Sequence, residues 1–147
     1  MLSAHTTAML LTLGVVAITV TLHYEGLNAL NNALPRWRHV PARLRMLVLI
    51  ALLLVLHLVE IGIFGLGIHM ATHFPSLGGI SGGHPALSLM DAVYLSATTY
   101  STLGYGDLVP HGAIRILVGV ESVVGLLMIT WSASFTYLEM QRYWTPR

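Results

Sequence analysis

The chain has 147 residues, of which 55% are hydrophobic and only 9% carry a formal charge. This composition is typical of a membrane protein, and the length allows one domain with a few membrane-spanning helices. The absence of cysteine excludes disulfides and thiolate metal sites. The formal net charge of +1 offers no basic face for binding nucleic acid.

The first predicted element is a membrane-spanning helix within residues 1–24. Residues 6–23 form an apolar run without formal charge that is long enough to cross a bilayer. A cleaved signal peptide is the alternative, but no basic residue precedes the run and no convincing cleavage site follows it. An interfacial helix would need a polar face, which the run lacks. We therefore expect a retained helix, and its lack of arginine argues against a voltage sensor.

Residues 25–45 are predicted to form a cytoplasmic linker. Polar residues and leucines alternate up to Pro35, which predicts a short amphipathic helix ending there. Trp37 would lie at the depth of the lipid headgroups. Arginines beside a membrane segment are typical of the cytoplasmic side, and the linker contains Arg36, Arg38, Arg43 and Arg45. We expect them to set the topology, with binding of an anionic lipid as a second hypothesis.

The next segment predicts an outward-running membrane helix, a loop and a re-entrant helix. Residues 46–68 are long and apolar enough to span the bilayer, and residues 69–87 predict an extracellular loop rich in glycine and polar side chains. Ser88 and Asp91 have the spacing of a capping box, so a helix should begin there. That helix, residues 88–101, is too short to span a membrane and too apolar to be exposed. We therefore expect a pore helix that enters the membrane, with its negative dipole end favouring a cation.

Residues 113–138 predict the last membrane helix, which would run back inward to a short tail at residues 140–147. Arg115 lies at its outer end, whereas Arg142 and neighbouring aromatic residues lie at its inner end. With three crossings, we expect the N-terminus outside and the C-terminus in the cytoplasm. We expect the membrane to be a plasma membrane of the bacterial inner-membrane type.

The stretch between the short helix and the last helix is the most informative in the chain. It comprises Thr102, Leu103, Gly104, Tyr105 and Gly106, followed by Asp107. A dehydrated cation needs oxygens in place of water, and backbone carbonyls from several chains can supply them. Successive carbonyls face one way when the backbone alternates between left- and right-handed regions, which Gly104 and Gly106 permit. Thr102 can add its hydroxyl oxygen, and Tyr105 can pack behind the pore. An ordinary turn is the alternative, but the motif lies between two long apolar segments.

This motif resembles the selectivity filter of potassium channels, Thr-x-Gly-Tyr-Gly-Asp. The order of helix, pore helix, filter and helix over residues 46–139, with the filter at residues 102–107, resembles their two-transmembrane pore module. The chain looks especially like small prokaryotic ion channels with one extra N-terminal helix. The resemblance implies an all-α membrane fold, a homotetramer around a central pore, and passive conduction of K⁺ with no further cofactor. No nucleophile–base pair or phosphate-binding loop indicates an enzyme.

Two departures from the family pattern leave other functions open. Leu103 stands where the family usually has Val or Ile, and leucine is not β-branched. Thr98 stands where some members carry a filter-supporting carboxylate, so Asp107 needs another partner, for which Tyr94 is the candidate. A weakly selective cation channel is therefore one alternative. A non-conducting membrane subunit that regulates other proteins is another.

The resemblance also implies roles for the last helix. Gly125 falls at the position of a gating hinge, with close helix packing as an equally weighted alternative. Leu126, Ile129 and Ala133 follow at helical spacing and share one face, which we assign to the water-filled cavity. Packing between helices is the alternative for each of them.

Ionisable residues inside predicted membrane helices are functional candidates by default. His57 and Glu60 share one helix face, and Glu121 could approach either of them from the last helix. One interpretation is a polar cluster that fixes helix packing. A pH sensor behind the filter is the second, since burial favours the neutral form of a carboxyl group. A metal site is the third, although known di-iron bundles use more ligands.

Histidines on the predicted outer side form a separate group, which comprises His69, His73, His84 and His111. Imidazole groups ordinarily titrate near pH 6.5, so protonation could change the local concentration of cations. His111 is nearest to the filter and is the candidate for sensing external pH. Solvated loop histidines without a function are the alternative.

Overall fold

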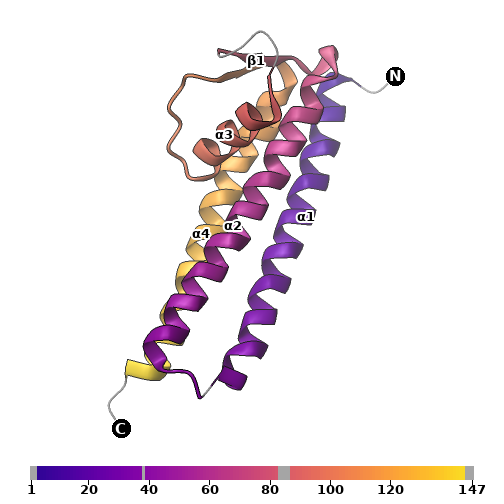
Figure 1. Cartoon of the computed structure of the whole chain (residues 1–147). Helices are drawn as coiled ribbons and strands as arrows, with labels where there is room; N and C mark the ends of the chain where they lie inside the picture. The colour runs from indigo at the N-terminus through magenta and orange to yellow at the C-terminus, as the bar shows by residue number, and fades with distance from the viewer. Residues whose placement is uncertain (1–2, 38, 83–86, 145–147) are drawn as a thin grey trace.

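The computed structural model describes residues 3–37, 39–82 and 87–144, with side chains up to residue 142. Three long helices lie side by side in it (Figure 1): α1 at Ala4–Ala33, α2 at Ala42–Thr72 and α4 at Arg115–Trp144. Each belongs to a segment that is long and apolar enough to cross a membrane. The chain therefore has the all-α architecture of a multi-pass membrane protein.

The short elements gather at one end of this bundle. Helix α3, Leu89–Tyr100, lies against α2 and α4 near the end where the N-terminus is found (Figure 1). Strands β1, Gly79–Ser81, and β2, Val109–His111, pair antiparallel with Ile80 opposite Pro110. Three 3₁₀ turns complete the described elements: η1 at Leu34–Trp37, η2 at Pro75–Leu77 and η3 at Gly112–Ile114. The C-terminus and the α1–α2 connection lie at the opposite end.

Helix α1 differs from its predicted extent. It continues without a break from Ala4 to Ala33, so the separate amphipathic helix expected after residue 24 is part of the same element. The added turns pack on α2, where Leu27 and Leu34 are buried against Leu49 and Leu53. The helix gives way to η1 just before Pro35, which cannot donate a backbone hydrogen bond. Burial against α2 therefore outweighs the local polarity that suggested a linker.

The other long helices also extend beyond their predicted ends. Helix α2 begins at Ala42 directly after Pro41 and continues to Thr72, rather than spanning 46–68. Helix α4 continues to Trp144, well past residue 138. A run of apolar residues identifies only the part of a helix that crosses the hydrocarbon core. The hydrogen-bonded helix itself continues into the polar sequence on either side.

Burial separates the bundle into a protein-facing and an outer side. The main core joins α2, α3 and α4 through fully buried side chains such as Phe64, Ile68, Tyr100 and Leu117. Large apolar side chains of α1 and α2, Leu54 among them, point outward instead. An apolar exterior of this kind is suited to the bilayer interior, because lipid tails are as apolar as the side chains that face them.

Candidate functional site

Helix α3 begins as its capping box predicts. The Ser88 hydroxyl accepts a hydrogen bond from the Asp91 amide at 3.1 Å, and the Asp91 carboxylate accepts one from the Ser88 amide at 3.1 Å. Its approach to α2 depends on Gly65, since a β-carbon there would lie 2.8 Å from the Cα of Val93. The cap and this close packing together fix where the helix begins and how it lies on the bundle.

The carbonyl end of α3 anchors the chain that follows it. The amides of Leu103 and Gly104 both donate to the Thr98 carbonyl, at 2.9 and 3.0 Å, and the Thr102 amide donates to Thr99. The Thr98 hydroxyl itself donates back to the Leu95 carbonyl within the helix. Thr98 therefore holds the motif through its backbone, and its side chain gives no support to Asp107.

The backbone of the motif alternates between positive and negative φ. Thr102, Gly104 and Gly106 have φ values of 59°, 56° and 81°, whereas the residues between them have negative φ. Within the described part of the chain, Thr102 is the one non-glycine residue with positive φ. A β-carbon at Gly104 or Gly106 would meet no atom within 4 Å, so glycine is needed there for its backbone freedom rather than for space. Residues 101–107 are all exposed on the single chain.

Side chains behind and beyond the motif belong to α3 and the outer loop. The rings of Tyr105 and Tyr94 stack with centroids 6.4 Å apart and planes 6° apart. Desolvation and a hydrogen bond with the Asp107 carboxylate raise the pKa of Tyr94 above its ordinary value. This contact supports the pairing of Tyr94 with Asp107 that the sequence suggested.

The loop before α3 packs closely against residues 107–111, which follow the motif. A β-carbon on Gly82 would lie 1.9 Å from the carbonyl oxygen of Asp107, and one on Gly78 would lie 2.0 Å from that of His111. Both glycines have positive φ. His111 itself is exposed, at the end of β2. The two glycines therefore let the loop backbone approach the carbonyl groups of Asp107 and His111.

Helix α4 packs against the inner end of α3 through a glycine. A β-carbon on Gly125 would lie 2.2 Å from the Tyr100 carbonyl oxygen, and α4 runs through this position without interruption. The geometry supports the close-packing interpretation of Gly125, and its action as a hinge stays a prediction. Leu126, Ile129 and Ala133, the predicted cavity face, are all exposed on the single chain.

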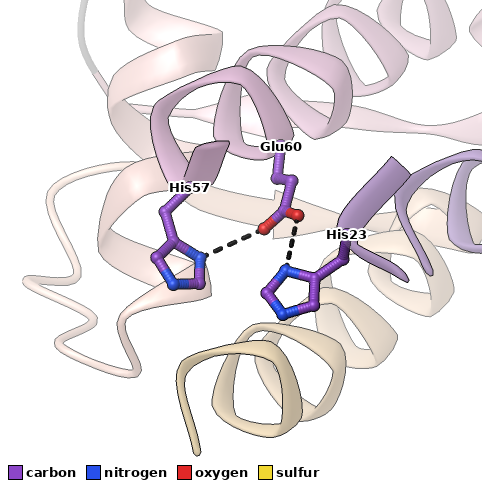
Figure 2. A group of neighbouring side chains, drawn as sticks. All are labelled: His23, His57 and Glu60. Carbon is purple, nitrogen blue, oxygen red and sulfur yellow. Dashed lines mark hydrogen bonds and ion pairs between the residues drawn. The ribbon is translucent and has the colours of Figure 1, made fainter. Parts of the chain in front are cut away.

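A buried polar cluster lies behind Tyr100, and its membership differs from the predicted one. His23 of α1 and His57 of α2 both direct Nδ1 toward the carboxylate of Glu60, at 2.8 and 3.1 Å (Figure 2). The Tyr100 hydroxyl donates a hydrogen bond to the same carboxylate. His23, Glu60 and Tyr100 are almost completely inaccessible to solvent. The cluster therefore joins α1, α2 and α3 at one carboxylate.

Glu121 lies elsewhere, contrary to the expected approach to Glu60 or His57. Its Oε1 is 2.5 Å from the hydroxyl of Ser96, which also lies 2.8 Å from the Ile61 carbonyl. Glu121 is one helical turn before Gly125, and Ser96 is one turn before Tyr100. The Gly125–Tyr100 contact therefore directs Glu121 to Ser96, one turn away from the cluster.

His23 was missed by sequence reasoning because it stands at the last position of the first apolar run. The predicted helix end at residue 24 placed it at the membrane surface, where a histidine needs no partner. The continuation of α1 to Ala33 moves it well inside the helix. Its place as an ionisable residue at the edge of a spanning segment was the available signal.

The predicted metal ligands were His57, Glu60 and Glu121, but in the structure His23 takes the place of Glu121 beside the other two. His23, His57 and Glu60 offer ligand atoms within 4.8 Å of one another, a spacing that could hold a metal ion. Each of these atoms already has a hydrogen-bond partner inside the cluster. The arrangement thus satisfies its own buried polar groups as it stands.

The predicted lipid-binding arginines do not form one exposed set. Arg36 and Arg43 are exposed, whereas Arg45 is buried, so its guanidinium is not free to face lipid headgroups. Arg38 lies outside the described residues, as does His84 of the outer histidine group. The longer α2, which begins at Ala42, carries Arg45 into the packed part of the bundle.

Comparison with known protein families identifies the part of the chain that contains α3 and the motif. A family model described as "Ion channel" matches residues 53–141, which include most of α2, all of α3, the filter motif and most of α4. No curated protein and no solved structure matches the chain. The matched region covers more than half of the sequence and corresponds to the two-transmembrane pore module. The chain therefore belongs to the ion channel family.

Proposed function

We propose that this chain forms a passive, potassium-selective channel. The observation that carries the proposal is the backbone of residues 102–106, where positive φ recurs at every second residue. This alternation lets successive carbonyl oxygens face one side, as an ion that has lost its water requires. The Thr102 hydroxyl would add an oxygen at the inner end. Membership of the ion channel family points to transport rather than catalysis.

The proposed channel is a homotetramer, as the resemblance to potassium channels implies. One chain provides a single filter strand, and a shell around K⁺ needs strands from several copies. The filter residues are exposed on the single chain, beside an open groove that includes Thr99, Arg115 and Ser122. Copies of the chain would fill this groove, with Leu126, Ile129 and Ala133 facing the shared cavity. K⁺ is then the permeant ion, and no further cofactor is required.

The arrangement of the ends supports the proposed orientation in the membrane, which we take to be a plasma membrane of the bacterial type. The N-terminus lies at the end of the bundle that carries α3, and the α1–α2 connection with its arginines lies at the other (Figure 1). Arginine-rich connections are typically cytoplasmic. The filter and the N-terminus would then be extracellular, with the C-terminus in the cytoplasm. Arg36 and Arg43 remain available to anionic lipid.

Flux from proteoliposomes tests the proposal. Purified protein should release K⁺, Ba²⁺ should block the release, and Na⁺ flux should be small. Equal K⁺ and Na⁺ fluxes would favour the weakly selective alternative, for which Leu103→Val is the informative variant because it restores a β-branched side chain. A folded tetramer without flux over a range of pH would favour the non-conducting subunit.

A pair of glycine variants makes the test specific to the filter. Gly106→Ala adds one methyl group in open space but at a φ of 81°, which alanine adopts only with strain. Gly62→Ala adds the same group in open space on helix α2. We expect Gly106→Ala to lose K⁺ selectivity and Gly62→Ala to retain it. Size-exclusion chromatography shows whether both variants still assemble.

A further inference from the structure

Glu60 is a shared acceptor at the centre of the bundle. Its two carboxylate oxygens contact His23 Nδ1 at 2.8 Å, His57 Nδ1 at 3.1 Å and the Tyr100 hydroxyl. The carboxylate is 0% exposed, so water cannot replace any of these partners. Removing one donor leaves a buried carboxylate with a hydrogen bond unmade, which is unfavourable because nothing else can take the donor's place. The three donors are therefore energetically linked through one group.

Tyr100 connects this carboxylate to the filter. It is the last residue of α3, two positions before Thr102, and is 1% exposed. Its hydroxyl donates to Glu60 and lies 3.0 Å from His57 Nδ1, and its carbonyl lies against the backbone of Gly125 on α4. Thr98, half a turn earlier, accepts the amides of Leu103 and Gly104. A shift of the last turn of α3 would therefore move the inner end of the filter.

His23 links α1 to the same point. Its Nε2 lies 3.5 Å from the Ser132 hydroxyl of α4, and its ring is 5.2 Å from that of Trp131. The imidazole thus fills the space between Glu60 and α4, at the level of Tyr100. His23 lies outside residues 53–141, the region that matches the family model. The link is consequently a property of the helix that this chain adds to the pore module.

We propose that His23 and Glu60 are positioning residues for the filter, which act through the Tyr100 hydroxyl and make α1 a determinant of ion selectivity. The inference rests on the proposed potassium conduction and names two residues that act on it without touching the ion. Glu60 fixes the Tyr100 ring, and His23 fixes the Glu60 carboxylate. Loss of either contact frees the last turn of α3 and lets the carbonyl spacing at the filter relax.

Two pairs of variants at His23 and at tyrosine separate positioning from general stability. His23→Leu keeps a side chain of similar volume but removes the donor, whereas His23→Asn can return an N–H group near the position of Nδ1. Tyr100→Phe removes only the hydroxyl, which donates a hydrogen bond to Glu60 and also contacts His57. Tyr137→Phe is its matched control, since the Tyr137 hydroxyl is exposed on α4 and contacts Gln141.

The K⁺ to Na⁺ permeability ratio, from reversal potentials, is the first readout. We expect His23→Leu and Tyr100→Phe each to lower it roughly tenfold, because both free the last turn of α3. A change of that size corresponds to ~1.4 kcal/mol in the difference between the K⁺ and Na⁺ barriers. The double variant should be little worse than either, because both act through Glu60. His23→Asn and Tyr137→Phe should keep the wild-type ratio. An unchanged ratio in His23→Leu, with only a lower melting temperature, would overturn the proposal.

Amide hydrogen exchange at Leu103 and Gly104 is the second readout and does not depend on selectivity. Faster exchange in His23→Leu than in His23→Asn supports the positioning role, and equal exchange in all variants contradicts it. If the wild-type channel proves unselective, the proposed potassium selectivity fails, together with the part of the inference that concerns selectivity. The exchange rates still decide whether His23 positions the filter. If Tyr100→Phe fails to assemble, the His23 pair gives the answer alone.

Discussion

Gly125 of α4 and Tyr100 at the end of α3 are in direct backbone contact. A β-carbon at position 125 would lie 2.2 Å from the Tyr100 carbonyl oxygen and 2.8 Å from its Cα. Backbone cannot yield as the end of a flexible side chain can. The contact therefore makes glycine necessary at this position for steric reasons, whether or not the helix also bends there.

Gly125→Ala should consequently destabilise the assembled protein. Overpacking against backbone costs about 1–3 kcal/mol, more than the gain of up to ~1 kcal/mol from replacing glycine within a helix. Gly119→Ala, on the same helix, is the matched control because its β-carbon would meet nothing within 4 Å. We expect it to be neutral or slightly stabilising. Thermal unfolding in detergent measures both, and equal melting temperatures for the two variants would contradict the steric argument.

Tyr94 should contribute to the alkaline limit of stability. Its pKa is raised in the folded state, so its contribution is present below the ordinary value near 10 and is lost as the pH rises through the raised value. Melting temperatures between pH 8 and pH 11 should fall less steeply for Tyr94→Phe than for the wild type. Tyr137→Phe should follow the wild type. Asp107→Asn should reproduce part of the Tyr94→Phe effect, and a wild-type slope in Asp107→Asn would count against the pairing.

His111 is expected to confer sensitivity to acidic external pH. It is exposed at the end of β2, in the segment that leaves the filter, and a protonated ring in each subunit would repel cations at the pore entrance. Current should decrease on external acidification in the wild type. His111→Asn should remove most of this decrease, and His73→Asn, also exposed, serves as the control. A pH–current curve that His111→Asn leaves unmoved would show the idea to be wrong.

Metal removal should leave the protein unchanged. His23, His57 and Glu60 are close enough to hold an ion, but each already has a hydrogen-bond partner in the cluster. We expect dialysis against EDTA to alter neither the melting temperature nor the flux. A decrease in melting temperature that occurs in the wild type and is absent in His23→Leu would instead identify a bound metal ion.

Features that depend on a few neighbouring residues could be predicted from the sequence. The capping box at Ser88 and Asp91 uses side chains three positions apart, and the glycines of the filter motif follow from the φ values they permit. Apolar length was sufficient to find the three membrane helices. In each case the determining forces act within one segment.

Features that depend on packing between segments could not be predicted. Nothing local to residues 25–33 indicates that they would bury Leu27 against α2, so the end of α1 was placed too early. The partner of Glu121 depends on the rotation of α4 about its axis, which the Gly125 contact sets. His23 reaches Glu60 only because α1 is long enough to place it beside α2. These positions are set by tertiary contacts, which no local pattern encodes.

Two contacts between α3 and α4 limit where α4 can bend. Ser96 meets Glu121, and Tyr100 meets Gly125, so both pairs join residues that are 25 apart and the two helices share one register over a full turn. Residues 96–100 of α3 and 121–125 of α4 are therefore joined at two points, next to the motif at residues 102–106. We therefore expect any bending of α4 that keeps these contacts to occur between Gly125 and the C-terminal end of the helix. Bending between the start of α4 and Gly125 would instead move the end of α3 and, with it, the motif that is hydrogen-bonded to Thr98 and Thr99.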